Sequence, residues 1–197
     1  MKIFDWRTCL FLSTALFMGS CGKQERSEAV QFAKVLTEER VTFVSANTTE
    51  RDFVSNARAW CGGITTNGAG RGVELDQNAA VAAELGKSVV AISSQLSEVR
   101  QAINRQSLTG QYPRDVRAEL TDQLTKRQRM LQEMRMLFEQ SAPQFLEYKL
   151  NKAYVGDTYP DGVAKLDALL RTYSPPNDAV GAALTALQTK YRLGKEL

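Results

Sequence analysis

The chain has 197 residues, of which 25 are lysine or arginine and 22 are aspartate or glutamate, so its formal net charge is +3. It contains no histidine and only three cysteines. This composition excludes a histidine general base and removes the commonest ligand of transition metals. The length suits a single domain with a sizeable core.

The first residues have the composition of an export signal. Lys2 and Arg7 provide positive charge, and residues 10–18 form an apolar run that is interrupted only by one serine and one threonine. This run is shorter than the roughly 20 residues that a membrane-spanning helix needs. A short apolar segment behind a positive start is typical of a signal peptide, so we expect residues 1–20 to be one.

Small residues follow the apolar run. Gly19 and Ser20 precede Cys21, and a signal peptidase needs slim side chains at such positions. Together with Met18, the pattern resembles the lipobox of bacterial lipoproteins, with Cys21 at the modified position. The resemblance covers residues 1–21 only, and Met18 stands where the family most often has leucine. An ordinary cleaved secretory signal and an uncleaved anchor stay open as alternatives.

The resemblance implies a lipid anchor. Acylation of Cys21, as with palmitate, would hold the mature chain in one leaflet, because more than one acyl chain gives stable anchoring. Gly22 stands where an aspartate would be the familiar signal for retention in the inner membrane. The resemblance therefore favours the outer membrane of a bacterial cell envelope, facing the periplasm. We expect residues 21–26 to be a lipidated tether and residues 27–197 a single α-helical domain.

The first part of this domain is predicted to hold two helices and a loop. One helix begins at Ser27, a suitable N-cap, and a second begins at Thr49, where Asp52 would complete a capping box. The apolar side of the first helix consists of Val30, Ala33, Leu36, Val41 and Val44. Residues 61–72 contain five glycines, each costing about 1 kcal/mol inside a helix. This segment is therefore predicted to be a loop.

The strongest periodic signal lies in the middle of the chain. Apolar residues there are spaced alternately three and four apart, at Ala82, Leu85, Val89, Ile92, Leu96, Val99 and Ile103. Such a heptad seam indicates a long helix, about 75–108, packed lengthwise on another. Gly110 is predicted to stop it, and Pro113 fits the first turn of the next helix. The second seam is broken near Arg127. A short connection favours an antiparallel hairpin over about 75–141.

Turn residues divide the rest of the chain. Residues 155–162 are predicted to turn, with Asp161 capping a further helix, and the prolines within 174–178 end that helix. A final helix follows, and no segment shows sustained strand alternation. The predicted fold is all-α, a helical bundle built around the long antiparallel coiled-coil-like hairpin, with shorter flanking helices.

Cys61 is the one thiol that would remain after loss of Cys9 with the signal peptide and acylation of Cys21. It lies between Trp60 and two glycines, so its sulfur could be accessible. A cysteine nucleophile normally needs a base, and no histidine is present. We interpret Cys61 as a structural or incidental thiol, and an intermolecular disulfide or thiol catalysis stays open as an alternative.

No cofactor or metal site is predicted. The glycine-rich segment lacks the Gly-Lys-Ser/Thr ending of a phosphate-binding loop. Asp157 and Asp161 lack the ligand spacing of an EF-hand, and Pro160 interrupts the segment between them.

The hairpin carries an excess of positive charge. Between Arg100 and Arg135 there are eight lysines or arginines against four acidic residues. The densest cluster is Lys126, Arg127 and Arg129, which we name as candidate contacts for an acidic partner or an anionic envelope surface. A solvated helix face is the simpler interpretation. Nucleic acid is not expected as a partner of an exported, anchored protein.

Three classes of function remain. The first is a non-enzymatic envelope lipoprotein whose hairpin serves protein–protein interaction or scaffolding, and this is the function that we predict. The second is a carrier of an apolar ligand, in a bundle cavity lined by residues such as Phe138, Phe145 and Tyr148. The third is a thiol-dependent enzyme that uses Cys61. The expected partners are the membrane, through the lipid anchor, and an envelope protein.

Overall fold

The computed structural model describes residues 6–151, 159–174 and 177–194, and for residues 6–21 it describes only the backbone. The described residues form helices and no strand, which confirms the predicted all-α fold. The helices are α1 (Trp6–Asn67), α2 (Val73–Asn104), α3 (Gln111–Leu150), α4 (Asp161–Thr172) and α5 (Ala179–Tyr191).

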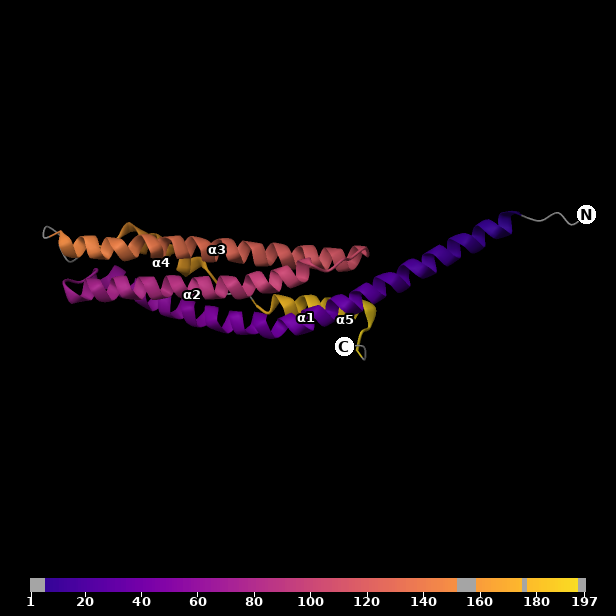
Figure 1. Cartoon of the computed structure of the whole chain (residues 1–197), viewed down its shortest axis with the longest axis horizontal. Coiled ribbons are helices and arrows are strands. Elements are labelled where there is room, and N and C mark those ends of the chain that lie inside the picture. Colours follow the sequence, from indigo (N-terminus) through magenta and orange to yellow (C-terminus); the bar gives the residue numbers. More distant parts are fainter. Residues whose placement is uncertain (1–5, 152–158, 175–176, 195–197) are drawn as a thin grey trace, which may run out of the picture.

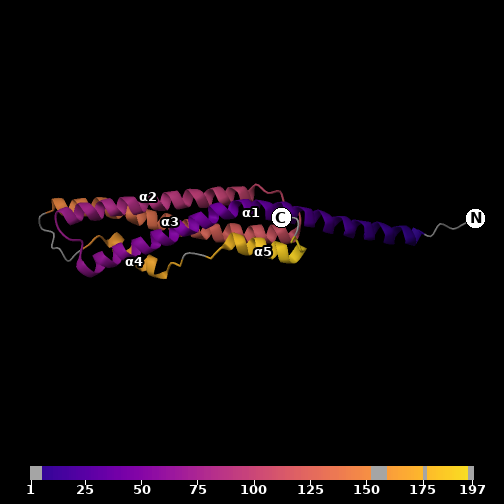
Figure 2. The same cartoon turned by 90° about the horizontal axis from the view of Figure 1, so that it is seen from below.

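The helices form an elongated bundle whose fourth helix is interrupted. Helices α1, α2 and α3 alternate in direction, and α4 and α5 follow one another along the side opposite α2 (Figures 1 and 2). Helix α2 packs on α1 and α3, whereas α4 and α5 each pack on α1 and α3. The arrangement is therefore an up-down-up-down bundle with two short helices in the fourth position.

The hairpin predicted from the heptad seam is present as α2 and α3. All seven seam residues of α2 are buried, with Leu75 and Ala79 extending the seam toward the start of the helix. Helix α2 ends at Asn104 and not near 108, and α3 continues to Leu150, beyond the predicted end near 141. Pro143 lies inside α3, and burial of Phe145 beyond it offsets the cost of the lost backbone hydrogen bond.

The prediction of two separate helices starting at Ser27 and Thr49 is wrong, because both segments belong to the single helix α1. A buried stripe with a seven-residue period runs through both, at Ala29, Leu36, Phe43, Glu50, Ala57 and Ile64. The Thr49 hydroxyl donates to the Ser45 carbonyl within the helix (3.1 Å) and caps nothing. Val41 and Val44, predicted on the apolar side, are 76% and 44% exposed. The helix continues because this stripe needs burial along its whole length.

The predicted loop at 61–72 is also shorter than expected. Residues 61–67 belong to α1, and only residues 68–72 connect it to α2. Burial of Cys61 and Ile64 offsets the cost of two glycines inside the helix. The connection needs glycine at Gly70, where φ is +77° and an added Cβ would lie 2.4 Å from the Glu74 carboxylate.

The segment predicted as a tether is helical and joins the bundle. Residues 22–26 are part of α1, and two acidic side chains on that helix cap α3. The Glu28 carboxylate accepts hydrogen bonds from the Thr109 and Gly110 amides at 2.8 and 2.9 Å. Glu25 accepts one from the Tyr112 amide at 3.2 Å. Gly110 is thus the N-cap of α3 and not the stop of α2, and α1 supplies the carboxylates that its first turn lacks.

The C-terminal helices begin at turn residues. Asp161 is the first residue of α4, whose N-cap is Pro160, so the predicted cap is displaced by one position. Asp178 caps α5 by accepting a hydrogen bond from the Gly181 amide (2.8 Å). It also pairs with Arg40 of α1 at 2.7 Å. Residues 155–158 of the predicted turn, including Asp157, and the prolines at 175 and 176 lie outside the described residues.

Replacing Glu28 tests the cap that α1 provides for α3. The amide of Gly110 and the hydroxyl of Thr109 hold the pKa of Glu28 at about 2, below its ordinary value of 4.5. The ionised carboxylate therefore stabilises the folded state fully above about pH 4.5, and this contribution is lost as the pH falls toward 2. We expect the thermal midpoint of the native chain to fall over this window more than that of Glu28→Gln.

Circular dichroism melts between pH 7 and pH 2 measure this difference. Glu38→Gln is the matched control, because Glu38 is exposed on the same helix. Parallel midpoint curves for the native chain and Glu28→Gln would contradict the proposed cap.

Candidate functional site

A polar groove runs between α2 and α3 on the outer side of the hairpin. Its volume is about 700 Å³. It is lined by Val90, Ser93, Ser94, Ser97 and Arg100 of α2 and by Thr125, Gln128, Arg129, Gln132 and Arg135 of α3. We call it the hairpin groove. Of the described residues that line it, three are arginines, four bear hydroxyl groups and none is acidic.

Helical periodicity explains how the sequence builds this groove. On each helix the lining residues recur every three or four positions, next to the apolar seam, so they form a stripe along one side. The two stripes face the same side because the seams between α2 and α3 interdigitate. Neither α4 nor α5 packs on α2, so these helices do not cover the stripe contributed by α2.

The arginines of the hairpin groove differ in their contacts. Arg100 donates to the Thr125 hydroxyl at 3.4 Å, and Arg135 pairs with Glu139 on its own helix at 2.6 Å. Arg129 is exposed and has no hydrogen-bond or ion-pair partner among the described residues. A guanidinium group binds a carboxylate or phosphate through two parallel hydrogen bonds. Arg129 is therefore the member of the groove best placed to take an anionic group.

The three predicted contact residues have three different environments. Arg129 lines the groove, whereas Lys126 is exposed outside it and pairs with Asp122 one turn away at 2.7 Å. Arg127 is only 5% exposed and lies in the bundle core. Its inclusion among the partner contacts is therefore wrong, because its guanidinium group faces α1 and not the solvent.

Arg127 belongs to a buried polar cluster. It occupies the seam position that appeared as a break, and it donates to the Glu50 carboxylate through Nε at 2.6 Å and also through Nη2. The Tyr173 hydroxyl at the end of α4 donates to the same carboxylate. The Phe43 ring lies 5.2 Å from the guanidinium carbon. Burial, followed by the charge of Glu50, raises the pKa of Tyr173, so its hydroxyl stays protonated as a donor.

Two atoms of this region lack a hydrogen bond. Arg127 Nη1 and Asn47 Oδ1 are buried without a partner among the described residues. Asn47 lies one helical turn before Glu50. Sequence reasoning missed the cluster, although the seven-residue spacing that places Glu50 between Phe43 and Ala57 was a signal for it.

Removing one charged member of the cluster should lower the free energy of unfolding more than removing the whole cluster. Glu50→Leu or Arg127→Met alone leaves an unpaired buried charge, and such changes typically cost about 3–5 kcal/mol. The triple variant Glu50→Leu, Arg127→Met and Tyr173→Phe removes every member that hydrogen-bonds within the cluster. We expect it to be more stable than either single variant, because an apolar replacement of a whole buried network is often near neutral.

Urea unfolding followed by circular dichroism gives the free energies of unfolding for this comparison. Additive losses across the single and triple variants would show that the three side chains act independently, against the network described above.

Cys61 is fully buried in the core, so its sulfur is not accessible as its glycine neighbours suggested. Burial, with the charge of Asp167 as a second cause, raises the pKa of the Cys61 thiol to about 12. The reactive thiolate is therefore scarce at neutral pH. This environment suits a small apolar side chain better than a nucleophile.

The aromatic residues named for a carrier cavity pack on other rings. Phe138 lies 5.9 Å from Phe53 and 5.8 Å from Trp60, and Phe145 lies 5.8 Å from Trp60, measured between ring centroids. Tyr148 packs against the same core. Contacts at these distances fill space that an apolar ligand would need. They count against a carrier site at this position.

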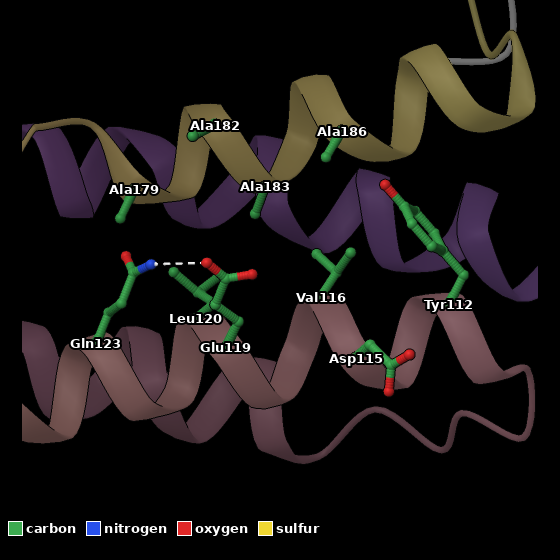
Figure 3. Close-up of a pocket in the computed structure, with 10 residues that line it drawn as sticks. All are labelled: Tyr112, Asp115, Val116, Glu119, Leu120, Gln123, Ala179, Ala182, Ala183 and Ala186. Atoms are coloured by element: carbon green, nitrogen blue, oxygen red, sulfur yellow. Dashed lines mark hydrogen bonds between the residues drawn. The ribbon is translucent and has the colours of Figure 1, made fainter.

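A smaller groove lies between α3 and α5 and has a volume of about 290 Å³. Figure 3 shows alanine methyl groups of α5 opposite Val116 and Leu120, and Asp115 and Glu119 of α3 also line the groove. Glu119 accepts a hydrogen bond from Gln123 at 3.3 Å.

In the described part of the chain, no cluster of three or more histidine, cysteine, aspartate or glutamate side chains could hold a metal ion.

The proposed lipid-attachment residue lies at one end of the bundle. Met18, Gly19, Ser20 and Cys21 are all within α1, which extends past the other helices at its N-terminal end (Figure 1). Within the described ranges, no helix has a stretch that is both long and apolar enough to span a bilayer.

Comparisons of the chain with protein-family models, curated proteins and solved structures found no match.

Proposed function

We propose that the protein is a non-enzymatic lipoprotein of the bacterial cell envelope that binds an acidic segment of another envelope protein in its hairpin groove. The observation that carries this proposal is the basic, hydroxyl-rich lining of that groove on a side of the hairpin that α4 and α5 leave uncovered. The helical bundle acts as a scaffold that holds the two sides of the groove in register.

The chemistry of the groove suits an acidic peptide segment. Its arginines would pair with carboxylates, while the serine hydroxyls and glutamine amides would hydrogen-bond to backbone groups. The part of the groove on α3 runs from Thr125 to Arg135, about 15 Å at 1.5 Å per residue. This length matches two to three turns of a bound helix or a short extended segment.

Pre-organisation favours binding at this groove. The seam residues of α2 and α3 that hold the two stripes in register are fully buried along most of their length. The fixed helices keep the lining residues at a set spacing, so the backbone of the groove need not be ordered when a partner binds. Charge complementarity at an exposed groove mainly raises the association rate and selects the partner.

The anchor rests on the signal-like segment and on the sequence Met18-Gly19-Ser20-Cys21. Removal of residues 1–20 would leave Cys21 at the end of the bundle, on the same helix as the Glu28 cap. In the outer membrane, an acylated Cys21 would place the hairpin groove in the periplasm.

Photo-crosslinking in the cells that make the protein tests the groove. A crosslinker at Ser94 or Gln132 should join the chain to one acidic protein, whereas one at the exposed Asn56 of α1 should not. Arg129→Glu should then weaken direct binding of that purified partner by about tenfold or more, because it places like charges in contact. Lys126→Glu is the matched control and should change binding by less than about twofold.

High salt should weaken the same interaction. Equal losses for Arg129→Glu and Lys126→Glu would reduce the site to general surface charge. Crosslinks from Asn56 to the same partner would place the interface elsewhere.

Intact-mass measurement tests the anchor. The protein extracted from membranes should begin at Cys21 and carry the mass of its acyl chains, and Cys21→Ser should release the chain from the membrane fraction. A mature chain that begins at residue 21 without lipid would refute the anchoring.

A further inference from the structure

One end of the bundle gathers segments from three parts of the chain. The first turns of the proposed mature chain meet the start of α3 through the bond between Glu28 and Gly110. The end of α5 meets the same turn, where the Tyr112 and Tyr191 rings lie 5.9 Å apart. We call this surface the anchor end. It consists of residues 22–28, 107–115 and 190–192.

The anchor end lies within about one helical turn of Cys21. Gln24 already donates to the Thr109 hydroxyl at 3.3 Å, and residues 21–28 are continuous helix. Three residues of helix span about 5 Å. A lipid on Cys21 would therefore hold the anchor end at the bilayer surface without a flexible spacer between them.

Positive charge predominates at the anchor end. Its exposed basic residues are Lys23, Arg26, Arg114, Lys190 and Arg192, and its acidic residues are Glu25, Glu28 and Asp115. The two glutamates are directed at the first amides of α3, and Asp115 accepts a hydrogen bond from Gln111 at 2.8 Å. The basic groups thus outnumber the carboxylates, and all three carboxylates are engaged within the bundle.

Aromatic residues add a second feature. Tyr112 and Tyr191 are partly buried and pack edge to face, and the ammonium group of Lys190 lies 5.4 Å from the centre of the Tyr112 ring. The Tyr191 hydroxyl is buried without a hydrogen-bond partner among the described residues, so the two rings pack this end of the bundle and support the Lys190 side chain. Lysine and arginine side chains nearby attract anionic lipids.

We propose that the anchor end docks on the anionic phospholipid headgroups of the bilayer that holds the Cys21 lipid, so that the bundle stands upright on the membrane. This proposal rests on the proposed lipidation of Cys21. Thr125 and Arg135 lie about 20 and 36 Å along α3 from Gln111. An upright bundle presents the hairpin groove at about that height, clear of the headgroups.

Depth measurements on the lipidated protein in vesicles test this orientation. One dye is attached at Ser107→Cys in the anchor end and another, in a separate sample, at Thr66→Cys near the opposite end. Both native residues are exposed, and native Cys61 is buried. A short-range quencher is carried on the lipid headgroups. In vesicles with anionic phospholipid we expect the Ser107 dye to be quenched several times as strongly as the Thr66 dye.

The contribution of charge is separated by lipid composition and by variants. Neutral vesicles or high salt should reduce quenching of the Ser107 dye by about half or more. The variant with Arg114→Glu, Lys190→Glu and Arg192→Glu should show the same reduction in anionic vesicles. The matched variant with Arg51→Glu, Arg71→Glu and Lys165→Glu changes three exposed residues elsewhere and should retain full quenching. Circular dichroism melts confirm that each variant is folded.

The outcomes distinguish this proposal from the anchor on which it depends. Equal quenching of the two dyes on a lipidated chain means that the bundle lies flat, and this overturns the upright orientation alone. Quenching of the Ser107 dye that does not change with lipid charge or salt overturns the proposed contact with anionic headgroups. A chain without lipid, shown by its intact mass, overturns the anchor and the orientation together.

Discussion

The carboxylate of Glu50 and the guanidinium group of Arg127 face one another inside an apolar bundle, and this pair constrains how α1 and α3 pack. Each occupies a position where its helix otherwise places apolar residues. A shift of either helix by one turn would separate the pair and leave two buried charges without partners, at a cost of several kcal/mol. Apolar side chains alone would tolerate such a shift more easily. We infer that the pair fixes the register of α1 against α3, and with it the position of α4, whose Tyr173 joins the same carboxylate.

The burial of residues that follow an uninterrupted apolar period was predictable from the sequence. Contacts that need two helices in register were not. The seam of α2 is uninterrupted and apolar, so its period is evident from the sequence. In α1 the same period passes through Glu50, beside a threonine that resembles a cap and before two glycines that resemble a loop. Local propensity favoured a break there, and burial of the whole stripe overrode it. Arg129 was found from charge density. Arg100, Arg135 and the serines join it only through the register of α2 against α3, and Arg127 pairs with a residue 77 positions away.

The fourth position of the bundle is filled by two short helices, and charged groups of α1 hold both of them in place. Helices α4 and α5 have 12 and 13 residues, lengths at which an isolated helix is marginal in water. Arg58 of α1 donates to the Leu170 and Tyr173 carbonyl groups at the end of α4. Arg40 of α1 pairs with the Asp178 cap at the start of α5. Helix α1 therefore binds both helices where they are interrupted, so that the two pieces cover the core as one helix would.

The unbroken course of α1 has a mechanical consequence. Because the proposed attachment residue and the contacts of Glu28, Arg40, Glu50 and Arg58 lie on one helix, a pull on the lipid would load that helix along its axis. Its neighbours run alongside it, so they would resist the load in shear, with many contacts strained together and not peeled apart one by one. The Glu50–Arg127 pair and the contacts of Arg40 and Arg58 join α1 to its neighbours across that sliding direction. If the chain is anchored as proposed, this arrangement would let it bear tension between the membrane and a bound partner without first losing its fold.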